Sequence, residues 1–243
     1  MFSFFGKGKK GVQDFSEVAV DMHSHLLPGV DDGSQSVKQS IELITGLQEL
    51  GFQHLVTTPH SMNDMYPNSL ATLKNSFNKL KGVIPEGIRL DYSSEYFLDE
   101  LFIENLRRDQ LKPLPGNRIL IEFSMANVPM NLEEILFEIR LKGYQIILAH
   151  PERFVFFHKQ PKAYSRFKDL DIEFQVNALS LSGYYGNHIK KMAENLIDEG
   201  WIDFIGTDLH HERHLSALRK VTEMKSFEKL LKSNGLKNQT LIS

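Results

Sequence analysis

Short apolar runs alternate with longer, helically periodic segments along the whole chain. The runs are rich in Val, Ile, Leu and Phe, and about seven of them are candidate strands, at residues 17–23, 54–58, 89–95, 118–123, 144–149, 173–176 and 203–206. The intervening segments carry apolar residues at helical spacing, most clearly at residues 34–50, 131–142 and 188–199. This alternation is typical of parallel strands covered by crossover helices. We therefore expect an α/β fold.

The ends of the clearest helices are also marked in the sequence. Ser34 stands where a helix N-cap is preferred, and Gly51, Gly143 and Gly200 follow the three helices, where a left-handed residue commonly ends a helix. Seven strand–helix units in 243 residues favour a barrel related to the eight-stranded TIM type. An open, doubly wound sheet would produce the same pattern. The strand and helix pattern alone does not distinguish the two folds, so the residues of the functional site are needed to choose between them.

The composition excludes several kinds of chemistry and of partner. The chain has no cysteine, so disulfides, thiolate zinc sites, iron–sulfur clusters and cysteine nucleophiles are excluded. The formal net charge of −3 and the lack of a long basic stretch with interleaved aromatic residues argue against a nucleic-acid partner. No stretch approaches the roughly 18 to 20 apolar residues that cross a bilayer. The apolar part of residues 1–11 is too short for a signal-peptide core, so we expect a cytoplasmic protein.

The first predicted strand ends in a group of residues that can bind a metal. Its sequence there is Asp-Met-His-Ser-His at 21–25, and side chains alternate along an extended segment. Asp21, His23 and His25 can therefore face the same way. Two imidazoles so placed suit one cation, and Asp21 could orient a ligand by hydrogen bonding. Paired histidines also occur as ordinary polar loop residues.

Similar residues follow nearly every other predicted strand. Glu122 stands between Ile121 and Phe123, where a buried carboxylate is costly unless a cation, hydrogen bonds or an arginine compensates it. Asp31 and Asp32 lie in a turn before a helix, and Asp31 could be only a helix cap. The complete set of candidate ligands is His23, His25, Asp32, His60, Glu95, Glu122, His150, Asp208 and His210.

Five imidazoles and four carboxylates are too many for a single ion. They could hold two or three divalent ions, with a carboxylate such as Glu122 bridging a pair. Nitrogen and oxygen ligands without thiolate favour Mn, Fe or Zn over Ca, which prefers oxygen ligands alone. Because both candidate folds place their active sites at the C-terminal ends of the strands, we expect these side chains to meet there.

Seven ordered motifs resemble those of the polymerase-and-histidinol-phosphatase (PHP) superfamily, and within it the bacterial CpsB/CapC-type manganese-dependent protein-tyrosine phosphatases. The motifs are Asp-Met-His-Ser-His at 21–25, Val-Asp-Asp-Gly at 30–33, Thr-Thr-Pro-His at 57–60, Ser-Glu-Tyr at 94–96, Ile-Glu-Phe-Ser at 121–124, Ala-His-Pro-Glu-Arg at 149–153 and Thr-Asp-Leu-His at 207–210. The resemblance implies a distorted (βα)7 TIM-like barrel, with residues 1–16 as a flexible tail and residues 17–243 as a single catalytic domain. It also implies that all nine candidates bind three divalent ions, Mn²⁺ first, with Fe or Zn as alternatives.

The resemblance further implies arginines that hold the substrate phosphate. Arg153, three residues after His150, matches one of them. Arg213 is the nearest candidate for a second arginine, although it follows the final Asp-x-His at a shorter spacing than in the family, and it could be a solvated loop residue. Asn177, at the end of the sixth predicted strand, could support a ligand or cap a turn.

The function implied is hydrolysis of phosphotyrosine in protein, on the tyrosine-rich tail of a membrane-associated bacterial tyrosine kinase that controls capsule or exopolysaccharide synthesis. We expect a metal-bound hydroxide to attack phosphorus while the ions and Arg153 stabilise the phosphoryl oxygens. His60 or His210 could move a proton only if metal binding does not fully engage them. The alternatives are a small-molecule phosphatase of the histidinol-phosphate kind, a phosphodiesterase, and a non-catalytic metal-stabilised scaffold.

Overall fold

Parallel strands form the centre of the molecule. A computed structural model describes residues 14–233 and 235–242. Within them the strands are β1 (Val20–Asp21), β2 (His54–Thr57), β3 (His60–Ser61), β4 (Arg89–Tyr92), β5 (Glu95–Phe97), β6 (Arg118–Glu122), β7 (Gln145–Ala149), β8 (Glu173–Asn177) and β9 (Phe204–Gly206). β2 and β3 follow each other after two residues, as do β4 and β5, so each pair occupies one strand position. The described strands therefore fill the seven predicted positions.

The strands curve into a distorted barrel. All pairings between strands are parallel, in the orders β1-β2-β4 and β3-β5-β6-β7-β8-β9. The end of β9 returns to the end of β1, where Asp208 N donates to His23 O at 2.7 Å and His25 N donates to Leu209 O at 2.9 Å. This return closes the ring of strands. The barrel expectation is thus confirmed, and the open doubly wound sheet is excluded.

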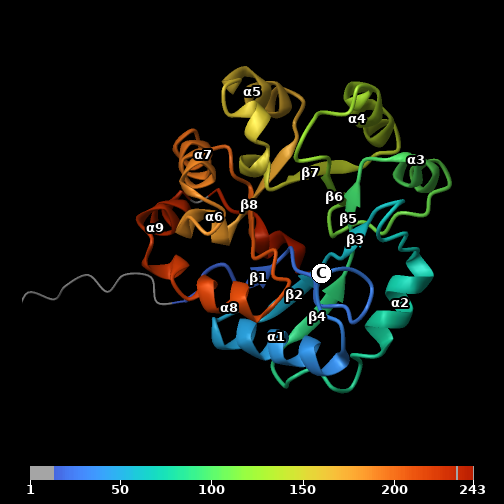
Figure 1. Cartoon of the computed structure of the whole chain (residues 1–243), viewed down its shortest axis with the longest axis vertical. Helices are drawn as coiled ribbons and strands as arrows, with labels where there is room; N and C mark the ends of the chain where they lie inside the picture. The colour runs from blue at the N-terminus through green and yellow to red at the C-terminus, as the bar shows by residue number, and fades with distance from the viewer. Residues whose placement is uncertain (1–13, 234, 243) are drawn as a thin grey trace, which may run out of the picture.

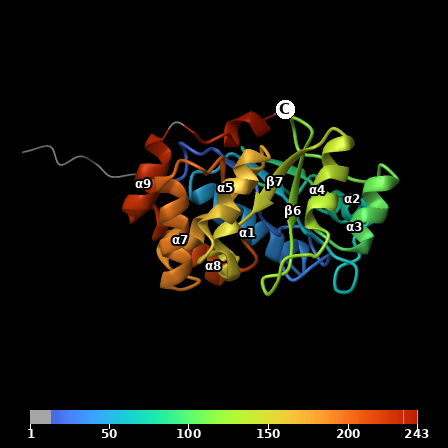
Figure 2. The same cartoon turned by 90° about the horizontal axis from the view of Figure 1, so that it is seen from above.

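Helices surround the barrel (Figure 1), and Figure 2 shows the same arrangement from above. They are α1 (Val37–Glu49), α2 (Leu70–Asn78), α3 (Glu100–Arg107), α4 (Leu132–Leu141), α5 (Pro161–Asp169), α6 (Ala178–Ser182), α7 (Asn187–Asp198), α8 (Glu212–Leu218) and α9 (Lys225–Lys232), together with short 3-10 segments. Among the described residues, no helix is long and apolar enough to cross a membrane.

The helix-end predictions are largely confirmed. Gly51, Gly143 and Gly200 follow α1, α4 and α7 with φ of 100°, 79° and 69°. The predicted cap of α1 is wrong by two residues, because the side chain of Ser36, not Ser34, accepts from a first-turn N–H. The hydroxyl of Ser34 instead contacts that of Ser40 at 2.8 Å.

Alternation along the strands separates the two faces of the barrel wall. In β6, Ile119 and Ile121 pack with the helices, whereas Leu120 belongs to a second apolar cluster that includes Val20, Ile147 and other buried residues. Glu122 has the same phase as Leu120. The alternation therefore directs Glu122 inward, above this apolar layer.

The apolar core extends further toward the N-terminus than expected. Phe15 is buried, and its ring centroid lies 4.9 Å from those of Phe52 and Phe227. The flexible tail that we predict for residues 1–16 is therefore too long at its C-terminal end, because Phe15 belongs to the core. The rest of the expected tail, residues 1–13, lies outside the described residues.

A charged network stabilises the end of the barrel opposite the predicted ligands. Asp203, just before β9, accepts from Lys168 Nζ at 2.7 Å and from Phe174 N at 2.9 Å, and its other oxygen lies 2.8 Å from Lys237 Nζ. Burial opposes ionisation of Asp203, but the bonds from Lys168 and Lys237 lower its pKa. A lowered pKa means that ionised Asp203 stabilises the fold above pH ~4, and that this stability is lost as the pH falls through the folded-state pKa.

We expect Asp203→Asn to lower the free energy of unfolding at pH 7 by about 1–3 kcal/mol, because Lys168 and Lys237 lose a partly buried carboxylate partner. Urea unfolding of both proteins in EDTA should show this difference shrinking toward pH 3. The matched control is Asp198→Asn, which removes an exposed carboxylate paired with Lys229 and should cost under about 0.5 kcal/mol. Equal effects of the two substitutions would contradict the prediction.

Candidate metal centre

All nine predicted ligands lie together at the C-terminal ends of the strands. Each stands at or just after a strand end or a strand break, apart from Asp32, which lies in the turn between β1 and α1. The set is His23 and His25 after β1, Asp32, His60 in β3, Glu95 in β5, Glu122 in β6, His150 after β7, and Asp208 and His210 after β9.

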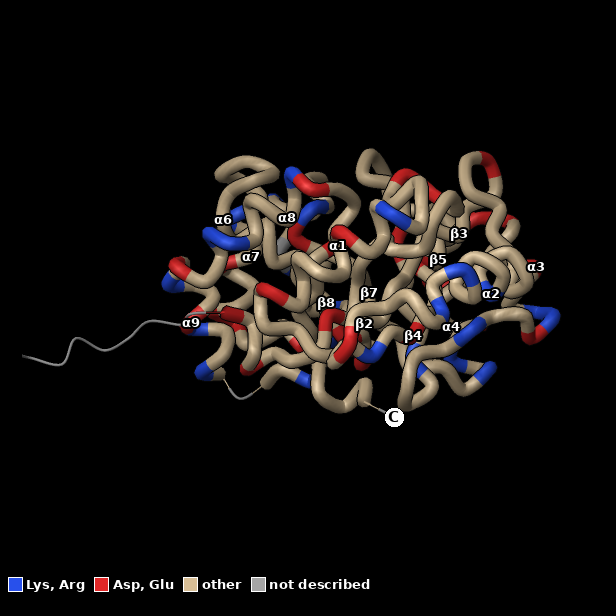
Figure 3. The backbone as a smooth tube through the Cα atoms, turned by 90° about the horizontal axis from the view of Figure 1, so that it is seen from below, with Lys and Arg blue, Asp and Glu red and all other residues tan. Residues whose placement is uncertain are grey.

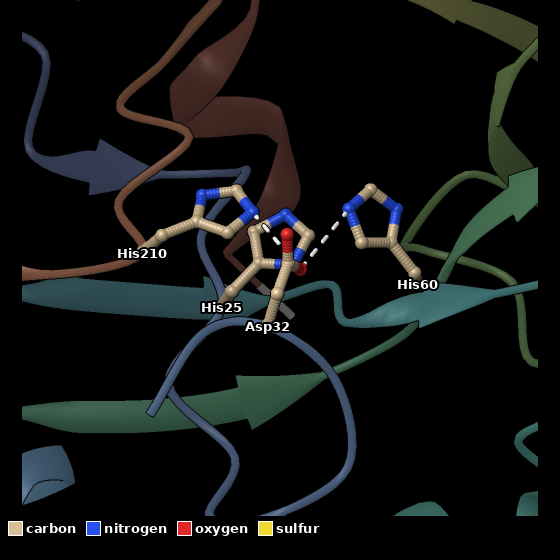
Figure 4. A group of neighbouring side chains, drawn as sticks. All are labelled: His25, Asp32, His60 and His210. Carbon is tan, nitrogen blue, oxygen red and sulfur yellow. Dashed lines mark ion pairs between the residues drawn. The ribbon is translucent and has the colours of Figure 1, made fainter. Parts of the chain in front are cut away.

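Seven of the nine form three overlapping groups that could each hold a metal ion. Within each group the candidate atoms lie within 4.8 Å of one another, and the groups are His25-Asp32-His60-His210, His23-His25-Glu95 and His60-Glu95-Glu122. Figure 4 shows the first group, with the Asp32 carboxylate between the rings of His210 and His60. Glu95 is the carboxylate shared by two groups, whereas Glu122, the carboxylate predicted to bridge a pair of ions, belongs to one group.

The two remaining candidates adjoin these groups. Asp208 Oδ1 lies 3.3 Å from His25 Nε2 and 3.5 Å from His23 Nε2. His150 Nε2 lies 2.9 Å from Glu95 Oε1. The three groups, Asp208 and His150 therefore form one continuous cluster of nitrogen and oxygen ligands.

Several buried ligand atoms face one another at close range. His60 Nδ1 lies 2.9 Å from Glu122 Oε1 and 3.1 Å from Glu95 Oε2, yet these three atoms make no directed hydrogen bond. His23 Nε2 and His25 Nε2 face each other at 3.3 Å. Imidazole nitrogens and carboxylate oxygens that converge in a buried site suit divalent ions. The residues therefore fit the metals that the resemblance implies.

Hydrogen bonds at the far side of the rings orient three of the imidazoles. His23 Nδ1 lies 2.8 Å from Gln175 Oε1, His25 Nδ1 lies 2.7 Å from Asp31 Oδ2, and His210 Nδ1 lies 2.9 Å from the Asp208 carbonyl. Each Nδ1–H can donate outward, which leaves the Nε2 lone pair for a metal.

For two of the residues that orient the imidazoles, the role in the structure differs from the sequence prediction or was not predicted. Asp31 was interpreted as a possible helix cap, but it is buried against His25, and although burial raises its pKa, His25 brings it down to about 2. Gln175 was not identified. The available signal was its place as a polar residue in a buried strand, in phase with Asn177.

Asp21 does not orient an imidazole, contrary to the expectation. Its carboxylate accepts from the hydroxyl of Thr207 at 2.7 Å and from Thr207 N at 2.9 Å, which joins β1 to the end of β9. Burial raises the pKa of Asp21 to about 6. Asp21 therefore helps to close the barrel beneath the ligands.

Charge is balanced inside the cluster. Burial disfavours the charged forms of His60 and Glu95, yet nearby carboxylates raise the pKa of His60 to about 10, and nearby imidazoles hold the pKa of Glu95 well below its ordinary value. Protons and metal ions thus compete for the same imidazole nitrogens.

The backbone is strained at two ligand positions. His150 and Asp208 have φ of 34° and 51°, in the left-handed region that is unfavourable for side chains other than glycine. Gly206, two residues before Asp208, packs closely against another ligand, since an added Cβ would stand 2.6 Å from His23 Cβ. The ligands are therefore held by close backbone packing as well as by hydrogen bonds.

A cleft of about 450 Å³ opens above the cluster and contains Arg153. Arg153 Nη1 donates to Asp208 Oδ2 at 3.0 Å, and its Cζ lies 4.7 Å from the centre of the Tyr185 ring. Asn177 Nδ2 donates to the same Asp208 oxygen at 2.7 Å, so Asn177 supports a ligand and does not cap α6 with its side chain.

Arg213 is not brought to the cluster. It is exposed on α8 and does not line the cleft, whereas His214, one residue later, does. A larger cavity of about 640 Å³ lies between α4 and α5, and none of the nine candidate ligands lines it. Among the described residues, the chemistry is concentrated in the smaller cleft.

Comparison with known proteins agrees with this geometry. Residues 19–236 match the family described as "Capsular polysaccharide synthesis, CpsB/CapC". CapC of Staphylococcus aureus is 32% identical over 202 residues, which cover 79% of this chain and 76% of CapC. Tyrosine-protein phosphatase YwqE of Bacillus subtilis is 30% identical over 196 residues, covering 79% of this chain and 77% of YwqE.

A solved structure shares the fold. It comes from work on YwqE of Bacillus subtilis and CpsB of Streptococcus pneumoniae, described there as unique metal-dependent tyrosine phosphatases. The TM-score is 0.73 at 28% identity, over 84% of this chain and 86% of the other. With the family match extending over most of the sequence, this chain belongs to the CpsB/CapC family of capsular polysaccharide synthesis.

Proposed function

We propose that this protein is a metal-dependent protein-tyrosine phosphatase whose substrate is the tyrosine-rich tail of a membrane-associated bacterial tyrosine kinase that controls capsule or exopolysaccharide synthesis. The observation that carries the proposal is the continuous cluster of five imidazoles and four carboxylates beside Arg153. The named activities of relatives in the same family support the reaction. The kinase tail follows from the resemblance of the motifs alone, and the cytoplasmic location stays a prediction.

The residues divide the chemical work between them. When bound, divalent ions, which we propose to be three Mn²⁺, would activate water as the nucleophile and neutralise charge on the phosphoryl oxygens. Arg153 presents a planar guanidinium that can bind phosphate through two N–H groups. Gln175 and Asp31 keep the imidazoles in the orientation that metal binding needs. Tyrosine, with a pKa of about 10, leaves as phenolate more readily than an alkoxide does.

The positions of His60 and His210 bear on proton transfer. Both Nε2 atoms face Asp32 Oδ1, at 3.7 Å and 3.6 Å, within one metal-ligand group. A nitrogen engaged with a cation has no free lone pair for a proton. We therefore assign both histidines to metal binding and give neither the role of general acid.

Charge distribution helps to separate the enzymatic alternatives. Figure 3 shows Lys and Arg interspersed with Asp and Glu along the described backbone, and no continuous basic track is visible in this view. A phosphodiesterase acting on nucleic acid usually needs such a track for the phosphate backbone. A small-molecule phosphatase does not need one, so it is the stronger rival.

One experiment tests the proposal against all three alternatives. The purified protein is assayed on a phosphotyrosine peptide, histidinol phosphate and single-stranded DNA, before and after EDTA. We expect the peptide to be the best substrate, EDTA to abolish turnover and Mn²⁺ to restore it. Equal or better turnover of another substrate would overturn the proposal. A metal-loaded protein that turns over none of the three would favour the scaffold.

A further inference from the structure

The cleft above the metal centre has two chemically different walls. One wall is apolar and comes from β3, β5, β6 and the loops after them, with Met62, Met65, Tyr66, Phe97 and Met125. The other wall follows β7, β8 and β9, and its residues are Arg153, Tyr185, His211 and His214. Because β3, β5, β6, β7, β8 and β9 are neighbours in this order, the two walls lie on different sides of the ligands.

The apolar wall is held in place by a tight loop. Met62 N donates to Tyr66 O at 2.9 Å, and Tyr66 N donates back to Met62 O at 3.0 Å. Asn63 N donates to Asp99 Oδ2 at 2.7 Å, which attaches the loop to the start of α3. The Tyr66 ring is nearly parallel to the ring of His60, at 15° and with centroids 5.8 Å apart. A flat apolar surface is thus fixed beside a metal ligand.

Two methionines extend this surface into solvent. Met65 is 63% exposed and Met125 is 37% exposed, although both line the cleft. Methionine side chains adapt to irregular surfaces and make favourable sulfur contacts with aromatic rings. Large apolar side chains exposed beside a polar site commonly mark a ligand contact. A ligand that fills this cleft would therefore place an apolar group against the surface and an anionic group near Arg153.

We propose that Met65, Tyr66 and Met125 form an aryl subsite that holds the phenyl ring of the substrate while Arg153 and the metal centre hold its phosphate. This inference rests on the proposed phosphatase function and adds the basis of its selectivity for aryl over alkyl phosphate esters. An alkyl phosphate reaches the same metal centre but leaves the apolar surface exposed to solvent. The adaptable methionines also allow different peptide sequences to flank the ring.

The test is the double variant Met65→Ala, Met125→Ala, with Met130→Ala as its control. Met130 lies in the loop that follows β6, as Met125 does, but it is fully exposed and lies outside the cleft. We expect the double variant to lower kcat/KM for a phosphotyrosine peptide about tenfold, mainly through KM. Turnover of β-glycerophosphate and inhibition by inorganic phosphate should change less than about twofold. The control should match the wild type in every assay.

Calorimetric binding of phenyl phosphate and β-glycerophosphate to the metal-loaded proteins makes the test independent of turnover. The wild type should bind phenyl phosphate more tightly, and the double variant should lose that preference. An unchanged aryl-to-alkyl ratio, or equal losses on both esters, would overturn the aryl subsite. A wild type that binds phenyl phosphate preferentially but does not hydrolyse phosphotyrosine would overturn the proposed function and leave the subsite standing.

Discussion

Glu95→Gln is expected to reduce both bound metal and activity more than any other single substitution. Glu95 is fully buried, and its Oε2 lies 3.1 Å from His60 Nδ1, 3.2 Å from His23 Nε2 and 3.5 Å from His25 Nε2. It is also the carboxylate shared by two of the three ligand groups. An amide keeps the shape but removes the negative charge that would balance bound cations. We expect kcat/KM on a phosphotyrosine peptide to fall roughly 10³-fold or more.

Elemental analysis of the purified variant separates this cause from misfolding. We expect fewer divalent ions per chain than in the wild type, with circular dichroism unchanged. The matched control is Glu100→Gln, an exposed carboxylate in the first turn of α3, which should keep full metal content and activity. A Glu95→Gln protein with full metal content and near wild-type turnover would remove Glu95 from the centre.

Local patterns were sufficient to place the strands, because the buried wall of a parallel barrel is apolar on both faces and reads as a continuous run. They did not predict that two strand positions are broken. Pro59 lies between β2 and β3, and it has no N–H to continue the ladder. Beside it, the hydroxyl of Ser94 bonds Pro59 O at 2.7 Å between β4 and β5. Because of these breaks, β3 begins at His60 and β5 begins at Glu95.

The ligand set was accessible from sequence for a related reason. The C-terminal ends of parallel strands meet at one end of a barrel. Metal-binding residues at these ends can therefore be predicted to lie together from the local sequence of each strand. The residues that orient the ligands cannot be predicted in this way, because they come from distant parts of the chain. Gln175 lies 152 positions from His23 in the chain, and nothing near either residue encodes their 2.8 Å contact. Arg213 shows the converse, since the resemblance suggested a phosphate-binding role despite the shorter spacing, whereas Arg213 is exposed on α8 and does not line the cleft.

Arg153→Ala is expected to lower kcat/KM on a phosphotyrosine peptide about 10²- to 10³-fold while the metals stay bound. The Arg153 side chain is 29% exposed, and its guanidinium lies over the Tyr185 ring and donates to Asp208 Oδ2. Loss of Arg153 does not leave that oxygen without a donor, because Asn177 Nδ2 bonds it at 2.7 Å. The effect should therefore fall on phosphate binding and transition-state charge, and elemental analysis should find wild-type metal content.

Arg153→Lys distinguishes a simple positive charge from the geometry of the guanidinium. Lysine keeps the charge but has no planar fork, so we expect it to recover less than about a tenth of the lost activity. The control is Arg166→Ala, an exposed arginine of α5 paired with Glu133 outside the cleft, which should stay within twofold of wild type. Full recovery by lysine would show that charge alone suffices. Loss of metal from Arg153→Ala would instead make Arg153 a positioning residue for Asp208, with the guanidinium needed to keep that ligand in place and Asn177 unable to hold it alone.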